Sequence, residues 1–190
     1  LGSNINTEND ETAPFIHPDG STIYFASNGH PGMGGRDLFF ATLLADSSWN
    51  KPVNLGYPIN TPADELNIFI NATGDVAYYA SDKDGGEGGL DLYYFILDEH
   101  LRPTPVTYMK GKITDKESGK PLEANIELID LNKSKTITST ISDPETGEFL
   151  ACILTGSNLM LNISHPFYLF YSENFKLTET ADSLKPFLKD

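Results

Sequence analysis

Residues 6–43 read NTENDETAPFIHPDGSTIYFASNGHPGMGGRDLFFATL, and residues 60–97 read NTPADELNIFINATGDVAYYASDKDGGEGGLDLYYFIL. The two stretches align without a gap at an offset of 54 residues, and the match extends upstream to Leu1 and Leu55. Because self-similarity at a fixed period marks repeat architectures, we infer an internal repeat and expect the chain to begin inside a repeated unit. The signature that the copies share is Gly20, Gly34, Gly35 and Asp37 in the first, and Gly74, Gly88, Gly89 and Asp91 in the second.

Each copy is expected to form short antiparallel strands. In the first copy, residues 13–17, 22–27 and 37–44 are predicted strands, because they are rich in aromatic and β-branched residues and are separated by turn and glycine-rich segments. Residues 51–55 can add a short outer strand, where Pro52 is tolerated. Four strands in about 40 to 55 residues match the size of one propeller blade. The aromatic residues of these strands are interpreted as packing between neighbouring blades, and they comprise Tyr24, Phe25, Phe39 and Phe40 with their counterparts Tyr78, Tyr79, Tyr93 and Tyr94.

The glycine-rich stretch at residues 28–37 allows several interpretations. A phosphate loop would require a following helix, but residues 36–44 indicate a strand. In the second copy, Asp82, Asp84, Glu87 and Asp91 offer oxygen ligands for calcium, whereas the first copy shares only the last aspartate, as Asp37. The alternative that we favour is structural: the glycines permit a tight connection, and the two shared aspartates accept hydrogen bonds from local backbone amides.

Composition limits the classes of function. The 190 residues include 13 Lys plus Arg against 27 Asp plus Glu, for a net charge of −14. This balance argues against nucleic-acid binding and against electrostatic docking on anionic lipid. No apolar stretch approaches the ~18 residues of a membrane-spanning helix. The single cysteine, Cys152, lies in the apolar run 149–154 and is expected to be a buried, inert thiol.

The second half of the chain does not continue the repeat. We divide the chain into repeats at 1–102, a linker at 103–106, a sandwich at 107–178 and a further linker at 179–190. Short strands separated by turns favour a β-sandwich. The predicted strands lie at residues 106–115, 123–131, 135–142, 147–154, 158–164 and 170–177.

The first half resembles the TolB-type, WD-like propeller repeat, on the residues PFIHPDGSTIYFASNGHPGMGGRDLFF and their second copy. The resemblance implies the C-terminal blades of a longer β-propeller, because two blades cannot close a ring. The second half, from KGKITDKESGKPLEANIELID to TGEFLACILTG, resembles the carboxypeptidase-regulatory-like domain, which implies a transthyretin-like β-sandwich without peptidase activity.

The order of these two parts resembles PorE-like proteins of the OmpA family in the type IX secretion system. That resemblance implies a periplasmic lipoprotein associated with the outer membrane, which binds other proteins of the assembly and contacts peptidoglycan through a domain absent from this sequence. Asp182, Ser183 and Leu184 resemble the O-glycosylation sequon of some exported bacterial proteins, with an ordinary linker as the alternative.

Catalytic and cofactor motifs are not apparent. The histidines His17, His30, His100 and His165 lack the spacing of zinc ligands, and no Gly-x-Ser-x-Gly elbow occurs. We therefore expect a non-enzymatic scaffold or interaction protein that has no cofactor. Two alternatives stay open: a TolB-like or carbohydrate-binding propeller module, and the non-catalytic part of a propeller-containing hydrolase.

Overall fold

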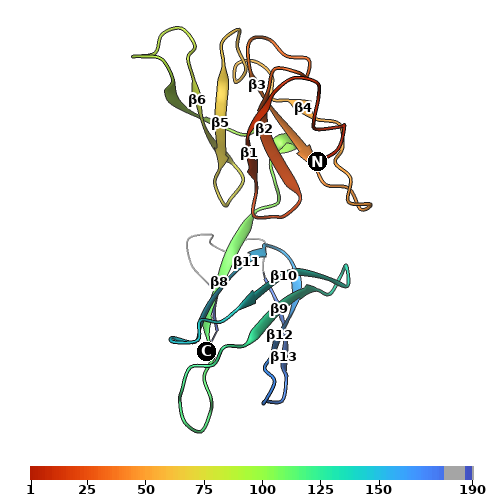
Figure 1. The fold of residues 1–190 in the computed structure, drawn as a ribbon, viewed down its shortest axis with the longest axis vertical. Coiled ribbons are helices and arrows are strands. Elements are labelled where there is room, and N and C mark those ends of the chain that lie inside the picture. Colours follow the sequence, from red (N-terminus) through yellow and green to blue (C-terminus); the bar gives the residue numbers. More distant parts are fainter. Residues whose placement is uncertain (178–186, 190) are drawn as a thin grey trace. The chain divides into compact units, whose positions relative to one another are not determined.

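The computed structural model describes residues 1–177 and 187–189, and the chain is all-β as predicted (Figure 1). In the described part, the regular elements are antiparallel or parallel strands and one 3-10 turn, η1 at Glu99–Leu101. The chain divides into two compact units, Leu1–Pro103 and Thr104–Asp190. The division falls inside the segment that the sequence assigns to a linker, residues 103–106.

The first repeat, residues 1–54, forms a four-stranded antiparallel sheet in the order β1-β2-β3-β4. Its strands are β1 (Glu11–Ile16), β2 (Thr22–Ser27), β3 (Asp37–Thr42) and β4 (Val53–Asn54). Every residue of β2 is buried, so this strand is the centre of the unit. The turn before β2 uses Gly20 at φ +69°, a left-handed conformation that glycine adopts without a steric penalty.

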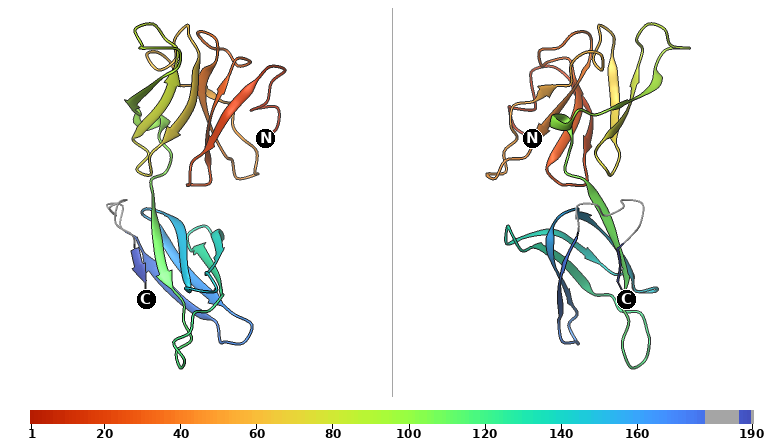
Figure 2. Two further views of the ribbon diagram at one scale, coloured as in Figure 1. Left: turned by 60° about the vertical axis from the view of Figure 1, so that its left-hand side comes forward. Right: turned by 180° about the vertical axis from the view of Figure 1, so that it is seen from behind.

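The second repeat, residues 55–102, forms a three-stranded antiparallel sheet from β5 (Glu65–Ile70), β6 (Val76–Ser81) and β7 (Asp91–Ile96). Figure 2 shows this sheet beside that of the first repeat within the same unit. Both repeats carry the same irregularity in their first strand. Ala13 and Asn67 occupy equivalent positions with positive φ, at 49° and 55°, and the strand register shifts at both. Such a bulge re-aims the side chains that follow it.

The two sheets share one hydrophobic core. The first repeat contributes Tyr24, Leu38 and Phe40, and the second contributes Ile68 and Ile70 from β5, which are 3% and 1% exposed. Full burial of an isoleucine side chain stabilises a fold by about 1.5–3 kcal/mol relative to leaving it in water. Burial of these two side chains therefore makes the contact between the repeats a substantial part of the unit's stability.

Polar contacts fix the position of the second repeat on the first. Asn60, fully buried, accepts a hydrogen bond from the Leu38 amide at 2.8 Å and donates one to the Leu38 carbonyl at 2.9 Å. The Asp64 carboxylate accepts from the Arg36 amide at 2.6 Å. In addition, the Gly35 amide donates to the Ala63 carbonyl at 3.1 Å. The segment before β5 is thus bonded to the loop and strand edge of the first repeat.

The expectation that the aromatic residues pack between repeats holds for some of them. Tyr24 and Phe40 stack in the shared core. Phe25 and Phe39 face the other side of the first sheet, where they form a separate core with Trp49 and other residues of the first repeat. The reason is the two-residue period of a strand, which sends neighbouring side chains to opposite faces.

The second unit has two sheets around a common core that includes Met109, Leu128, Ala151 and Leu161. One sheet has the order β10-β9-β12-β13 and the other β11-β8-β14. The strands are β8 (Val106–Lys112), β9 (Asn125–Asp130), β10 (Lys135–Ile141), β11 (Glu148–Leu154), β12 (Asn158–Ser164), β13 (Tyr171–Lys176) and β14 (Phe187–Lys189).

The segment at residues 179–190, expected to be a linker, contains β14, which pairs in parallel with β8. The rest of that segment lies outside the described residues, and so does the sequon-like Asp182, Ser183 and Leu184.

Cys152 is exposed, and the prediction of a buried thiol is wrong. The run 149–154 forms β11, an alternating strand in which Phe149, Ala151 and Ile153 face the core. Cys152 and Leu150 occupy the opposite face, and Leu150 is 59% exposed. An apolar run that forms a half-buried strand buries only every second side chain.

Substitution of Gly34 by alanine is expected to destabilise the first unit. A Cβ at Gly34 would lie 2.3 Å from the Pro62 carbonyl carbon and 2.4 Å from the Thr61 oxygen, both backbone atoms. We expect Gly34→Ala to lower the free energy of unfolding by about 1–3 kcal/mol, as overpacking does. Gly88→Ala, at the equivalent position of the second repeat, meets nothing within 4 Å and should change it by less than about 0.5 kcal/mol. Urea denaturation of dilute protein measures both, and equal losses would contradict the role of Gly34.

Candidate functional site

The two glycine-rich loops hold their shared aspartates by local hydrogen bonds, as the structural interpretation predicts. Asp37 accepts from the Met33 and Gly34 amides at 2.8 and 3.2 Å. Asp91 accepts from the Glu87 and Gly88 amides at 2.9 and 3.3 Å. These carboxylates therefore order their own loops.

The acidic residues of the second loop were considered as calcium ligands. Within the described ranges, no cluster of three or more His, Cys, Asp or Glu side chains is arranged to hold a metal ion. Asp82 accepts from the Asp64 amide at 2.9 Å, while Asp84 and Glu87 are exposed. Calcium at Asp82, Asp84, Glu87 and Asp91 stays a prediction.

The four histidines occupy separate places in the fold. His17 is fully buried and its ring nitrogen lies 3.3 Å from the Asn71 carbonyl. His30 contacts the Ile5 carbonyl at 2.8 Å, and His100 contacts Asp98 at 2.7 Å. His165 lines a cavity, which lies in the second unit.

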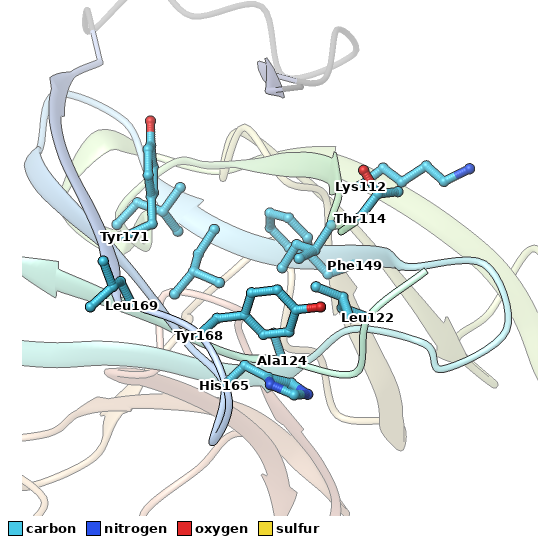
Figure 3. Close-up of a pocket in the computed structure, with 12 residues that line it drawn as sticks. Lys112, Thr114, Leu122, Ala124, Phe149, His165, Tyr168, Leu169 and Tyr171 are labelled. Atoms are coloured by element: carbon cyan, nitrogen blue, oxygen red, sulfur yellow. The ribbon is translucent and has the colours of Figure 1, made fainter. Parts of the chain in front are cut away.

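This cavity, about 350 Å³ in volume, is the candidate functional site (Figure 3). It opens at one end of the two-sheet core, where side chains from both sheets and from the loop between β12 and β13 meet. Figure 3 shows the Tyr168 ring projecting across the cavity between the labelled side chains. The lining residues are Lys112, Ile113, Thr114, Leu122, Ala124, Phe149, Leu161, Ile163, His165, Tyr168, Leu169 and Tyr171.

The walls are mostly apolar, because core residues of β11 and β12 line the cavity. Phe149 is buried and Ile163 is half-buried, so the floor of the cavity continues the core of the unit. The polar residues of the lining include Lys112 and His165. An apolar cavity with a few polar groups at its edge is the usual form of a binding site for a side chain or small apolar group.

Tyr168 is held in place by an acidic turn. Its hydroxyl donates to Asp115 at 2.7 Å, and its ring packs edge-on against His165 with ring centroids 5.0 Å apart. Hydrogen bonds from Ser118, and then from Tyr168, lower the pKa of Asp115 to about 2. The same bond to Asp115 raises the pKa of the Tyr168 hydroxyl. The ionised Asp115 thus fixes one wall of the cavity.

Beside the cavity, the loop of residues 165–170 exposes large apolar side chains. Phe167, Leu169 and Phe170 are 88%, 96% and 74% exposed. We call these three residues the apolar loop. Adjacent exposed side chains of this size commonly mark a surface that binds another protein.

Sequence reasoning did not single out this site. Its signal is the run HPFYLF at residues 165–170, which lacks the alternation that buries one side of a strand. The run separates β12 from β13, and its last residue, Phe170, was predicted as the start of a strand. Residues that line the cavity come from segments up to 59 positions apart, from Lys112 to Tyr171, so their meeting depends on the tertiary fold.

No significant match to this chain was found among protein-family models, curated proteins or solved structures. Among the described residues, none of the helical segments has the length and apolar character needed to cross a membrane.

Loss of the Tyr168 hydroxyl should raise the pKa of Asp115. In Tyr168→Phe we expect that pKa to move from about 2 part of the way toward 3.8, because the Ser118 hydrogen bonds remain. Since the folded-state pKa is lowered, the ionised carboxylate stabilises the fold above its usual pKa, and this contribution is lost as the pH falls through about 2. A carbon-detected NMR titration of Asp115 measures the shift.

The matched control is Tyr171→Phe, which removes the hydroxyl of another lining tyrosine, one that donates to Glu173. It should leave the Asp115 titration unchanged. An unchanged Asp115 pKa in Tyr168→Phe would contradict the assigned hydrogen bond.

Proposed function

We propose that this protein is a non-enzymatic, periplasmic scaffold that binds other proteins of an outer-membrane or secretion assembly. The observation that carries the proposal is the apolar loop beside the apolar cavity of the second unit. Leaving Phe167, Leu169 and Phe170 in water is unfavourable, and a partner that covers them gains the free energy of burying their area. The adjoining cavity of about 350 Å³ can receive one large apolar side chain of that partner.

The finer fold assignments belong to the same proposal. Two consecutive antiparallel sheets with a shared core support the interpretation of residues 1–102 as two blades of a TolB-type propeller. Two sheets around one core support a transthyretin-like, carboxypeptidase-regulatory-like domain at residues 107–178. The PorE-like order of these parts supports a place in a type IX secretion or related envelope assembly, as a lipoprotein associated with the outer membrane and with peptidoglycan.

The proposal is tested by capture of partners from an envelope extract, with Leu169 as the probe. Leu169 is 96% exposed, so Leu169→Arg should leave folding unaffected. We expect it to weaken partner binding by about 30-fold, the effect of losing an apolar anchor at the centre of an interface. The measurement is recovery of secretion-complex subunits by the immobilised protein.

Leu150→Arg is the matched control, because Leu150 is an exposed leucine of the same unit, on β11 and outside the cavity. It should recover partners as the unmodified protein does. Equal recovery by both variants would contradict the assignment of the apolar loop. Hydrolysis of a substrate panel by this chain, without any recovered subunit, would contradict the non-enzymatic scaffold.

A further inference from the structure

The four-stranded sheet of the second unit, β10-β9-β12-β13, has two edge strands that are protected to different degrees. The edge strand β10 has a bulge between Thr136 and Thr138, and the Thr138 hydroxyl donates to the Cys152 carbonyl of the other sheet at 3.3 Å. The edge strand β13 pairs with β12 without a register shift and contains no proline. Because bulges, prolines and covering segments are the usual protection of an edge strand, β13 presents an edge suited to pairing.

The hydrogen bonds between β12 and β13 determine which backbone groups face the outer edge. The Leu177 amide donates to the Ser157 carbonyl at 3.0 Å, so these two residues form a hydrogen-bonded pair just beyond the strand ends. Bonded and non-bonded pairs alternate along an antiparallel ladder. Every second residue back from Leu177 therefore bonds β12, and the residues between them, Ser172, Asn174 and Lys176, direct their N–H and C=O groups away from β12.

The other side of β12 gives the same alternation. The Leu131 amide donates to the Asn158 carbonyl at 2.9 Å, so the even-numbered residues of β12 bond β9 and the odd-numbered ones bond β13. Ser172, Asn174 and Lys176 are also exposed, so their outward backbone groups face solvent in the described structure. We call these three residues the β13 edge.

The β13 edge begins beside the cavity. Tyr171, the first residue of β13, lines the cavity, and so does Leu169 of the apolar loop. Figure 3 shows both side chains on one side of the cavity. Residues directly opposite each other on paired strands project to the same face of a sheet. A further strand on the β13 edge would therefore place the side chain opposite Tyr171 next to the cavity.

We propose that the β13 edge binds an extended segment of a partner protein as an added β-strand, with one large apolar side chain of that segment in the cavity. The proposal rests on the scaffold function proposed above and specifies the form of the partner. Outward N–H and C=O groups on every second residue match the backbone of another strand, whereas a helix satisfies its backbone groups internally. Main-chain hydrogen bonds then provide affinity, and the cavity of about 350 Å³ provides specificity for an aromatic or branched side chain.

The first test uses a displayed library of random peptides of about 12 residues, which is longer than a typical strand. We expect the selected peptides to share a large apolar residue within an alternating pattern. Asn174→Pro should weaken their binding by at least about 10-fold, because it removes an outward amide and leaves the hydrogen bonds to β12 intact. Asn174→Ala is the matched control: it keeps that amide, and binding should change by less than about 2-fold. Absence of selected peptides, or equal binding by Asn174→Pro and Asn174→Ala, would overturn the proposal.

The second test changes the peptide and leaves the protein unmodified. Each amide of a selected peptide is N-methylated in turn. Because only one side of an added strand bonds β13, methylation should reduce binding at every second amide and leave it within about 2-fold at the amides between them. Loss of binding at consecutive amides, or at none, would overturn strand addition.

Capture of partners from the envelope extract separates this proposal from the scaffold function. We expect both Leu169→Arg and Asn174→Pro to recover less of the partner than the unmodified chain does. Loss with Leu169→Arg and full recovery with Asn174→Pro would overturn strand addition and leave the scaffold function standing. Full recovery with Leu169→Arg would instead contradict the scaffold function on which strand addition rests.

Discussion

Asn60 holds the two repeats in register through two hydrogen bonds between its side-chain amide and the backbone of Leu38. Both hydrogen bonds are buried, at 2.8 and 2.9 Å, and a buried amide without partners is costly, so the position of the second repeat along β3 is closely specified. With this register set, Ile68 and Ile70 enter the shared core and Asp64 meets the Arg36 amide. The arrangement of the two sheets in the first unit therefore depends on the hydrogen bonds between Asn60 and Leu38.

The sequence predicts this unit well where a local pattern carries the structure. Strand β2 has the predicted bounds, 22–27, because its aromatic and β-branched residues lie between a Pro-Asp-Gly turn and a glycine-rich loop. The bulge at Ala13 and Asn67 was not predicted, since alanine in the first copy gives no sign of a positive φ. Glu11 and Glu65 each accept hydrogen bonds from a threonine and a serine of their own repeat. The sequence shows these glutamates only as an identity between the two copies and does not reveal their hydrogen bonds.

Burial is less predictable, because it depends on which neighbour covers a residue. Cys152 lies in an apolar run and is exposed, since the strand turns it away from the core. Tyr78 and Tyr94 match buried residues of the first repeat and are exposed, since nothing within the described structure covers them as the second repeat covers Tyr24 and Phe40. The cavity of the second unit is a further case, because its lining comes from both sheets.

Some residues shared by the two repeats act on their own loop, and others act on the neighbouring repeat. Asp37 and Asp91 make the same local hydrogen bonds, so that role belongs to each loop alone. Gly34 and Gly88 differ: the first admits the backbone of the next repeat, and the second faces open space. A glycine is not required at Gly88 by its φ or by any nearby atom. Gly34 therefore contributes to the contact between the repeats, whereas Gly88 makes no such contact within the described structure.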